Sequence, residues 1–189
     1  MTFDKFLFKP LSKSNWEKFE NLFGQNGACG GCWCMHWRLQ KSVFDKNKGS
    51  GNKKLMFKLV NSKAQTGILT FYKKEAVGWC AVAPREHFIR LDNSKILSRV
   101  DEQPVWSIVC FFVHKKFRKV GLSSIMLKAV IDFAKSKKIK ILEGYPVDPY
   151  LPNMPPAFAW TGFTSAFLKA GFIEVKRRSK SRPIMRYYL

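Results

Sequence analysis

Acidic residues are scarce in this chain of 189 residues, which has 13 Asp and Glu against 34 Lys and Arg and a formal net charge of +21. Such a surplus favours anionic partners, either a phosphate-bearing cofactor or nucleic acid. The sequence lacks the patterns of helix-turn-helix, zinc-finger and RNP-type proteins. Because charge alone carries little sequence specificity, nucleic-acid binding is only a third hypothesis.

Long apolar runs are also absent, and none approaches the roughly 18 residues that a membrane span needs. The N-terminus has no basic region followed by an apolar stretch, so no secretory signal is predicted. The five cysteines are an odd number in a chain large enough to fold without disulfides. We therefore expect a cytoplasmic protein in a reducing compartment, without a membrane partner.

Hydrophobic residues (46%) and aromatic residues (15%) are abundant enough for the core of one domain over residues 1–189. Their spacing predicts strands at 3–10, 67–72, 76–83, 105–113, 140–145, 172–177 and 183–188. It predicts helices at 14–23, around 55–60, after 121 and around 164–170, and a mobile polar loop at 45–54. The strand before the third helix and the strand after it predict a parallel pair joined by a right-handed crossover. The fold class is therefore a single α/β unit.

The most informative stretch leads from the apolar strand 105–113 through basic residues into an amphipathic helix. A helix N-terminus presents free backbone N–H groups and partial positive charge, which together favour an anion. Gly121 lets the backbone approach a ligand closely, while Arg118 and Lys119 add charges that suit phosphate. The loop predicts a phosphate cradle, for which a diphosphate is the natural ligand.

This loop resembles the acetyl-CoA signature of the GNAT acyltransferases, in which Arg or Gln is followed by two residues, Gly, one residue, and Gly or Ala. The match is good at Arg118 and Gly121 and imperfect at Ser123. Residues 169–172 resemble the family's last turn from helix to strand. The resemblance covers nearly the whole chain and implies the GNAT fold. This fold has one mixed, largely antiparallel sheet with a parallel strand pair around the cofactor helix.

The resemblance implies acetyl-CoA as the cofactor and direct acyl transfer to an amine. It would assign the coenzyme A pyrophosphate to the backbone of residues 119–124 and the pantetheine arm to the backbone of 111–113, with the thioester beside Cys110. The cofactor-binding residues that it implies are Phe111, Phe112, Val113, Arg118, Lys119, Val120, Gly121, Leu122, Ser123 and Ser124.

The catalytic groups are harder to assign, because acyl transfer needs both a base and an acid. GNAT enzymes often carry a Tyr four residues before the Gly of the last turn, and this sequence has Phe167 there. We predict Tyr145 as the replacement acid and Glu143 as the base or as a substrate anchor. Glu86 and Asp148 are the other nearby carboxylates. Ordinary structural roles for Glu143 and Tyr145 stay open.

The segment 29–38 is rich in Gly, Cys and Trp and fits neither a helix nor a strand period. It offers rings for stacking and an arginine fork, so we predict a substrate-pocket wall. The predicted substrate-binding residues are Trp33, His36, Trp37, Arg38 and Arg85. Core packing of the tryptophans is the alternative. Cys29, Cys32, Cys34 and His36 have poor spacing for zinc, so no metal is predicted, and direct transfer needs no nucleophile at Cys34.

The stretches 32–38, 78–85 and 145–148 resemble a poorly characterised GNAT subgroup to which no substrate can be attached. The main hypothesis is an N-acetyltransferase for a small amine, with an acidic group on the acceptor that Arg38, Arg85 and Arg90 would bind. The alternative is an acyl-CoA sensor or interaction module that has lost catalysis, motivated by Phe167. The sequence leaves the acceptor, the acyl length and the oligomeric state open.

Overall fold

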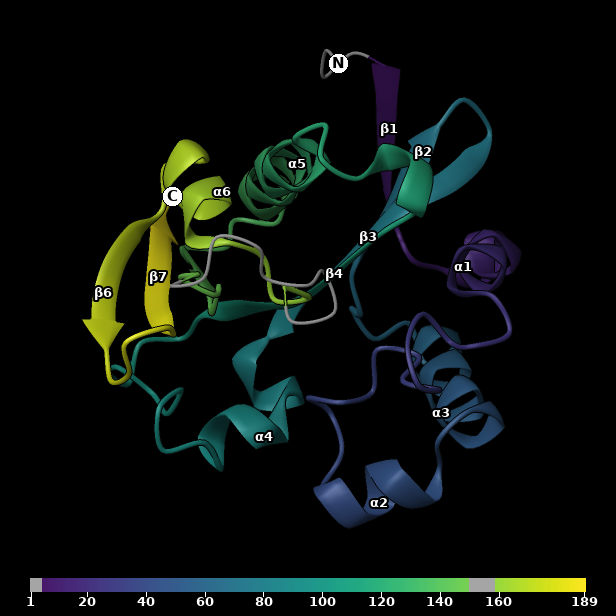
Figure 1. The fold of residues 1–189 in the computed structure, drawn as a ribbon, viewed down its shortest axis with the longest axis horizontal. Helices are drawn as coiled ribbons and strands as arrows, with labels where there is room; N and C mark the ends of the chain where they lie inside the picture. Colours follow the sequence, from purple (N-terminus) through teal and green to yellow (C-terminus); the bar gives the residue numbers. More distant parts are fainter. Residues whose placement is uncertain (1–4, 150–158) are drawn as a thin grey trace.

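Seven strands of the computed structural model form one mixed sheet in the order β1-β2-β3-β4-β5-β7-β6, and the structure describes residues 5–149 and 159–189 (Figure 1). The strands are β1 (Phe6–Pro10), β2 (Ile68–Tyr72), β3 (Glu75–Pro84), β4 (Trp106–Val113), β5 (Ile141–Gly144), β6 (Ile173–Arg177) and β7 (Pro183–Tyr188). Each lies within one or two residues of a predicted strand, except that the N-terminal prediction began three residues earlier.

One pair of neighbouring strands is parallel, β4 with β5, and the other neighbours are antiparallel. The parallel pairing runs from Trp106 opposite Leu142 to Ile108 opposite Gly144. Beyond that point β5 ends while β4 continues to Val113, so the two chains are no longer paired. The predicted sheet with its parallel pair around the helix is confirmed. The point where the pairing stops is where a ligand could enter the sheet.

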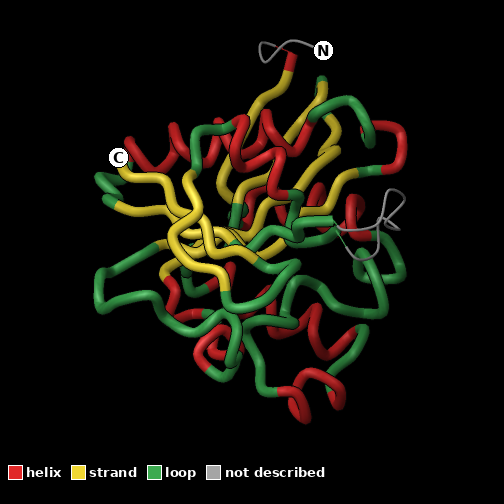
Figure 2. The backbone as a smooth tube through the Cα atoms, turned by 60° about the vertical axis from the view of Figure 1, so that its left-hand side comes forward, coloured by secondary structure: helices red, strands yellow, loops and turns green. Residues whose placement is uncertain are grey.

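Helices cover both faces of the sheet (Figure 1; Figure 2). The α-helices are α1 (Trp16–Phe23), α2 (Lys41–Lys46), α3 (Ser50–Asn61), α4 (Ile89–Asp92), α5 (Leu122–Ser136) and α6 (Thr164–Lys169). The described residues also contain the short 3-10 helices η2 (Lys13–Asn15), η3 (Arg85–His87) and η4 (Lys115–Phe117). The helices α5 and α6 lie on one face, and α1 to α4 lie on the other (Figure 1). Among the described residues, no helix has both the length and the apolar character that a membrane crossing requires.

Two apolar cores result, one on each face of the sheet. On the α5 face, the helix turns Met126 and Val130 toward the sheet, as its spacing predicts, and leaves Lys128 outside. On the other face, Phe19 of α1 and Trp79 of β3 are both fully buried, with ring centroids 4.9 Å apart. Burial of such large rings contributes most of the favourable free energy of folding.

The prediction of a mobile loop at 45–54 is wrong, because this stretch contains the end of α2 and the start of α3. Gly49 has φ of 82° and its N–H donates to the carbonyl of Gly31 over 3.0 Å. The side-chain amide of Asn52 is buried and donates to the same carbonyl over 3.1 Å. Contacts with the 29–38 segment therefore override the loop signal of the Gly-Ser-Gly sequence.

Candidate functional site

The turn between β4 and α5 presents a row of free backbone donors. Gly121 has φ of 78° and ψ of 10°, and a Cβ built there would have no atom within 4 Å. In the part of the chain that the structure describes, the N–H groups of residues 119–123 donate to no backbone or side-chain acceptor, whereas that of Ser124 donates to the carbonyl of Gly121 over 3.1 Å. The predicted cradle is therefore open to an anion through 119–123, and Ser124 contributes its side chain only.

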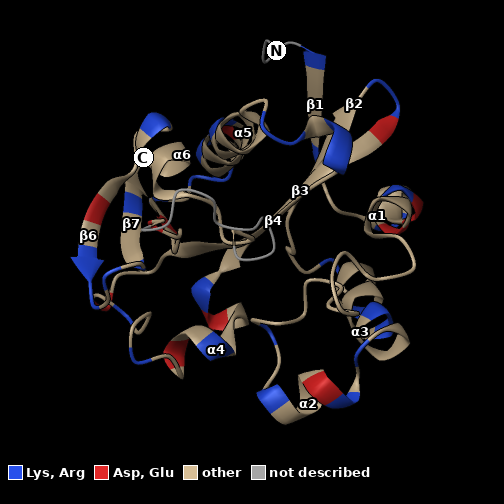
Figure 3. Cartoon of the chain, viewed as in Figure 1, with Lys and Arg blue, Asp and Glu red and all other residues tan. Residues whose placement is uncertain are grey.

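Positive charge surrounds this row of donors (Figure 3). Lys115, Lys116, Arg118 and Lys119 are exposed, and η4 carries the first two. Arg118 donates from Nε to the carbonyl of Val113 over 3.0 Å, which ties the loop to the end of β4. Backbone donors at a helix N-terminus with full charges around them suit a phosphate or a diphosphate. The residues present fit the pyrophosphate of a nucleotide-like cofactor.

A second segment reaches the place where β4 and β5 stop pairing. The N–H of Phe111 donates to the carbonyl of Trp160 over 2.6 Å. On the β5 side, the N–H of Val147 donates to the carbonyl of Gly162 over 2.8 Å, and Val147 forms an isolated parallel bridge with Phe163. Residues 160–163 therefore lie between the two chains. Of the backbone predicted to hold a pantetheine arm, the donor at Phe111 is already engaged.

Phe167 fills the same region from α6. Its ring is fully buried and stands perpendicular to that of Phe111, with centroids 6.0 Å apart. Gly144 and Gly162 make room for it, since a Cβ at Gly144 would lie 2.1 Å from Cε1 of Phe167. The position where GNAT enzymes often have a phenol thus holds a ring without a proton to donate.

The predicted catalytic pair lies in a closed polar network on the opposite face of the sheet. The hydroxyl of Tyr145 donates to Oε1 of Glu143 over 2.6 Å, and Nη1 of Arg85 donates to both Tyr145 (2.7 Å) and Glu143 (3.0 Å). The hydroxyls of Ser107 and Tyr145 lie 2.7 Å apart. Arg186 donates from Nε to Oε2 of Glu143 over 2.8 Å. All five side chains are at most 2% exposed.

Two carboxylates connect this network to the surface. Arg186 forms two hydrogen bonds with Asp101, of 2.6 and 2.9 Å, and Arg85 donates to Asp92 over 3.1 Å. Hydrogen bonding to Arg186 lowers the pKa of Asp101 to about 2. Burial, followed by the charge of Glu143, raises the pKa of Tyr145 well above its ordinary value. Tyr145 is therefore neutral at physiological pH.

Three of the five predicted substrate-binding side chains are in the interior. Trp33 is 4% exposed and stacks on Phe23 with centroids 5.7 Å apart. Arg38 is 8% exposed, donates to the carbonyl of Thr66 over 3.2 Å and lies over the ring of Phe88. Arg85 is part of the buried network. Arg38 and Arg85 donate to acceptors inside the protein, whereas Trp33 still lines a surface pocket together with Glu20 and Lys53.

The other two, His36 and Trp37, are half-buried and meet Trp160 beside β4. The ring centroids of Trp37 and Trp160 are 5.5 Å apart, and those of His36 and Trp160 are 5.1 Å apart. The indole N–H of Trp37 donates to the carbonyl of Val109 over 3.1 Å. Val109 is the extra residue of a bulge in β4, because Cys110 pairs with Ala81 and Ile108 with Val82.

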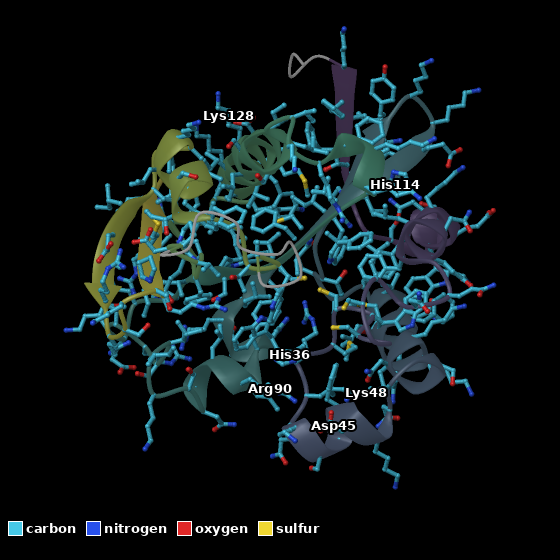
Figure 4. All side chains as sticks on the ribbon, in the orientation of Figure 1. His36, Asp45, Lys48, Arg90, His114 and Lys128 are labelled. Carbon is cyan, nitrogen blue, oxygen red and sulfur yellow. The ribbon has the colours of Figure 1, made fainter. Side chains whose placement is uncertain are left out.

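His36 also contacts Arg90 of α4 (Figure 4). Burial, and after it the charge of Arg90, lowers the pKa of His36 to about 4, so the imidazole is neutral at physiological pH. Arg90 itself donates from Nε to the carbonyl of Leu39 over 2.8 Å.

The cysteines are all free thiols. Within residues 5–149 and 159–189, no group of three or more His, Cys, Asp or Glu side chains could hold a metal ion. Cys34 is buried, and its sulfur accepts a hydrogen bond from the indole N–H of Trp79 over 3.1 Å. Cys110 packs against the same apolar core, and its interaction with Cys34 lowers the pKa of Cys34 and raises that of Cys110 well above its ordinary value.

The sequence reasoning missed Ser107, Arg186 and Trp160. Ser107 could have been noticed as the one hydroxyl in the apolar run 105–113. Arg186 stands in the last predicted strand at a position that turns out to be buried. The hydrogen bond between Phe111 and Trp160 joins distant parts of the chain, and no local sequence pattern predicts it.

Comparisons with known proteins agree with this architecture. The sequence profile of the Acetyltransferase (GNAT) family matches residues 33–149. No curated protein matches the sequence closely enough to count as a relative.

Solved acetyltransferase structures share this fold. A GNAT-family acetyltransferase from Listeria monocytogenes has a TM-score of 0.60 and 8% identity, with coverage of 97% of this chain and 95% of that one. The PaiA N-acetyltransferase from Thermoplasma acidophilum, solved with coenzyme A, has a TM-score of 0.54 and 12% identity, with both chains covered completely. The ribosomal-protein-S5-alanine acetyltransferase from Vibrio fischeri has a TM-score of 0.54 and 11% identity, over 100% of this chain and 95% of that chain. At such identities the likeness is one of fold.

Proposed function

Because the chain belongs to the GNAT acetyltransferase family, we propose that it transfers the acetyl group of acetyl-CoA directly to the amine of a small molecule. Acetyl-CoA is the acyl donor of this family and supplies the reactive thioester. The observation that carries the proposal is the row of free N–H groups at 119–123, which opens a buried helix beside the unpaired end of β4.

The pyrophosphate is proposed to bind the N–H groups of 119–123, with Arg118 and Lys119 as charged partners. Leu122 anchors the helix in the core, so the donors are held in place before a ligand arrives. The backbone of 111–113 is proposed to hold the pantetheine arm. For Phe111 this requires that the carbonyl of Trp160 give up its hydrogen bond.

The acceptor is proposed to bind beside β4 on the face that carries Trp37, His36 and Trp160. Two indole faces suit an amine with an aromatic or apolar frame, and His36 beside them is neutral, although Arg90 next to it carries a charge. Of the three arginines predicted to bind an acidic group on the acceptor, Arg38 and Arg85 donate to acceptors inside the protein. Arg90 lies beside His36, and its buried Nη2 has no hydrogen-bond partner among the described residues, so this arginine keeps the acidic acceptor as a hypothesis.

Glu143 and Tyr145 are predicted to be catalytic, and their contacts bear on how they would act. The Tyr145 hydroxyl already has three polar neighbours, and neither side chain reaches the surface. We therefore propose that the pair fixes the end of β5 beside β4. A role in proton transfer would instead appear as a changed pH dependence of kcat in Tyr145→Phe.

The alternative is a protein that binds acetyl-CoA without turning it over. Phe167 in place of a phenol and the engaged N–H of Phe111 favour it. One experiment separates the two: coenzyme A thiol release is measured with acetyl-CoA and a panel of aromatic, acidic and polycationic amines, and acetyl-CoA binding is measured by calorimetry. Turnover of an aromatic or apolar amine supports the proposal. Binding without turnover supports the alternative, and absence of binding contradicts both.

A further inference from the structure

One arginine lies beside the proposed acceptor site and is held there by the segment that carries its rings. Arg90 of α4 is half-buried. Its backbone N–H donates to the carbonyl of Trp37 over 3.2 Å, and its Nε donates to the carbonyl of Leu39 over 2.8 Å. The guanidinium is therefore fixed next to the side chains that are proposed to receive the acceptor.

Aromatic rings pack on this guanidinium. Nη1 of Arg90 lies 3.1 Å from Nδ1 and 3.2 Å from Nε2 of His36 (Figure 4). Its Cζ lies 5.3 Å from the ring centroid of Phe44. The His36 ring in turn meets the rings of Trp37 and Trp160, each with a centroid distance of 5.1 Å. One imidazole thus connects the guanidinium with the two indoles.

Among the residues that the structure describes, no carboxylate forms an ion pair with Arg90. The acidic side chains of this region serve other cations. Asp45, whose charge acts on His36, pairs with two nearby lysines. Asp92, in the same helix as Arg90, pairs with two other arginines. A charge that is partly withdrawn from water without a counter-ion costs free energy, so Arg90 lacks a partner that its surroundings favour.

The nitrogen Nη2 of Arg90 is enclosed and makes no hydrogen bond within the described part of the chain. Buried polar atoms are nearly always paired, so this donor is available to a group from outside the protein. Arg38 adds a second unpaired charge, because it is more than nine-tenths buried and has no carboxylate partner among the described residues. Two such charges at one segment favour an anionic group on a ligand that binds there.

The chemistry of a guanidinium determines which end of the acceptor it can receive. Its planar fork of N–H donors matches a carboxylate, whereas its charge repels an ammonium group. The amine must instead face the thioester, which is proposed to lie beside Cys110. On that side the indole of Trp37 reaches β4 at the carbonyl of Val109, while its connection to Arg90 passes through His36. The two charged ends of the acceptor should therefore be separated by its ring.

We propose, on the basis of the acetyl transfer proposed above, that Arg90 binds a carboxylate of the acceptor, which is an aromatic amine with its amine and carboxylate at opposite ends of the ring. The ring lies against Trp37 and Trp160, and the carboxylate accepts from Nη2 of Arg90. Because Nη2 is enclosed in this structure, binding requires a shift of one of the rings packed on the guanidinium. Arg90 is thus a specificity-determining residue and takes no part in bond making.

The first test compares acceptors that share a ring and an amine. In para-aminomethylbenzoate the amine and the carboxylate lie at opposite ends, and para-aminomethylbenzamide has a neutral group of similar shape in place of the carboxylate. Coenzyme A thiol release by the wild type should give a kcat/KM at least about tenfold higher for the benzoate, since hydrogen bonds to a charged group are the stronger ones. Equal values would overturn the inference and leave the proposed function intact. A preference for phenylalanine over the benzoate would contradict the separation of the two ends.

The second test measures the KM of both compounds in variants that circular dichroism shows to be folded. Arg90→Gln should raise the KM for the benzoate about tenfold or more, and change that for the benzamide by less than about twofold. Arg90→Lys retains a charge without the fork, so its KM for the benzoate should lie between those of the wild type and Arg90→Gln. A purely structural role of Arg90 would raise both KM values alike, and that result would contradict the inference.

Arg178→Gln is the matched control. Arg178 is also half-buried and also donates to backbone carbonyls, among them those of Ser98 (2.8 Å) and Arg99 (2.9 Å), but it holds the 96–99 segment. This variant should lower the free energy of unfolding and keep the preference for the carboxylate. A loss of preference as large as in Arg90→Gln would show that the site responds to any lost arginine contact, which contradicts a specific role of Arg90.

Calorimetry separates this inference from the proposed function, because binding needs no turnover. In the presence of coenzyme A, the wild type should bind para-aminomethylbenzoate more tightly than the benzamide, and Arg90→Gln should remove the difference. This result would support the carboxylate anchor even if no amine were acetylated, an outcome that would contradict the proposed function alone. Equal binding of the two compounds by the wild type would overturn the inference.

Discussion

The hydroxyl of Tyr145 donates a 2.6 Å hydrogen bond to Glu143, two residues earlier, and both side chains are enclosed by the protein. Around them, Arg85 and Arg186 neutralise the single carboxylate from two sides. The network joins β5, β7, β4 and the segment after β3, so it holds the strands at the edge of the proposed site.

Replacement of Glu143 by Gln should destabilise the fold by about 3–5 kcal/mol, because two buried arginines would lose their shared carboxylate. Tyr145→Phe should cost about 1–3 kcal/mol, since Arg85 and Ser107 would each lose a partner. Urea unfolding measures both values. The control is Glu86→Gln, which changes an exposed carboxylate next to Arg85 in sequence. A similar small effect for Glu143→Gln and Glu86→Gln would show that the network contributes little.

Gly144→Ala should also destabilise the protein, by a different cause. The new Cβ would lie 2.1 Å from the ring of Phe167, so that ring must move within a packed core, at a cost of about 1–3 kcal/mol. In Gly144→Ala with Phe167→Leu, the smaller side chain should relieve the clash. The two substitutions should therefore cost less together than the sum of their separate effects. Additive effects would contradict the contact.

Two substitutions of Gly121 that differ in charge test the phosphate cradle directly. Asn and Asp both tolerate the left-handed φ of 78°, and neither meets another atom within 4 Å at Cβ. Gly121→Asp should raise the KM for acetyl-CoA at least about tenfold more than Gly121→Asn, through repulsion of the pyrophosphate. The same carboxylate at a helix N-terminus should favour folding, so stability should not fall with affinity. Equal KM values for the two variants would argue against phosphate binding at this turn.

Local patterns were sufficient for most of the fold. The apolar run 105–113, the helix after Gly121 and the strand at 140–145 together predict the parallel pair that the structure contains. The loop prediction at 45–54 failed because contacts of Gly49 and Asn52 with Gly31, on a distant segment, determine its structure. Local propensity cannot register such contacts.

Only the parts of the candidate site that are formed by one continuous stretch of sequence could be predicted. The predicted cradle at 119–124 is continuous in sequence, and the N–H groups of 119–123 are free while that of Ser124 donates to Gly121. The predicted substrate-pocket wall could not be derived from a local pattern, since tertiary packing decides which rings of the 29–38 segment turn inward. Trp33 is in the core while Trp37 stays half-buried, although both are tryptophans of one short segment.

Acid should weaken the fold through Asp101. Its pKa is lowered to about 2 by the bonds from Arg186, below the ordinary value of an aspartate. A carboxylate with a lowered pKa stabilises the folded state at pH values above its unfolded pKa. This contribution is lost as pH falls toward 2. Asp101→Asn should therefore remove part of the decline in unfolding free energy over this window, measured by urea unfolding at several pH values. An identical decline in unfolding free energy for the variant and the wild type would show that other groups cause the acid sensitivity.

The aromatic side of the proposed acceptor site can be tested at Trp37. Trp37→Ala removes both the ring beside Trp160 and the hydrogen bond to Val109, so the KM for the acceptor should rise about tenfold or more, with little change in the KM for acetyl-CoA. Trp37→Phe retains a ring but loses the indole donor, and should fall between the wild type and Trp37→Ala. Trp106→Ala is the matched control, because this half-buried tryptophan packs on Phe133 of α5, across the sheet. It should reduce stability without a selective change in acceptor KM. An acceptor KM that responds equally to both tryptophans would mean that Trp37 acts through the fold and not through contact with the amine.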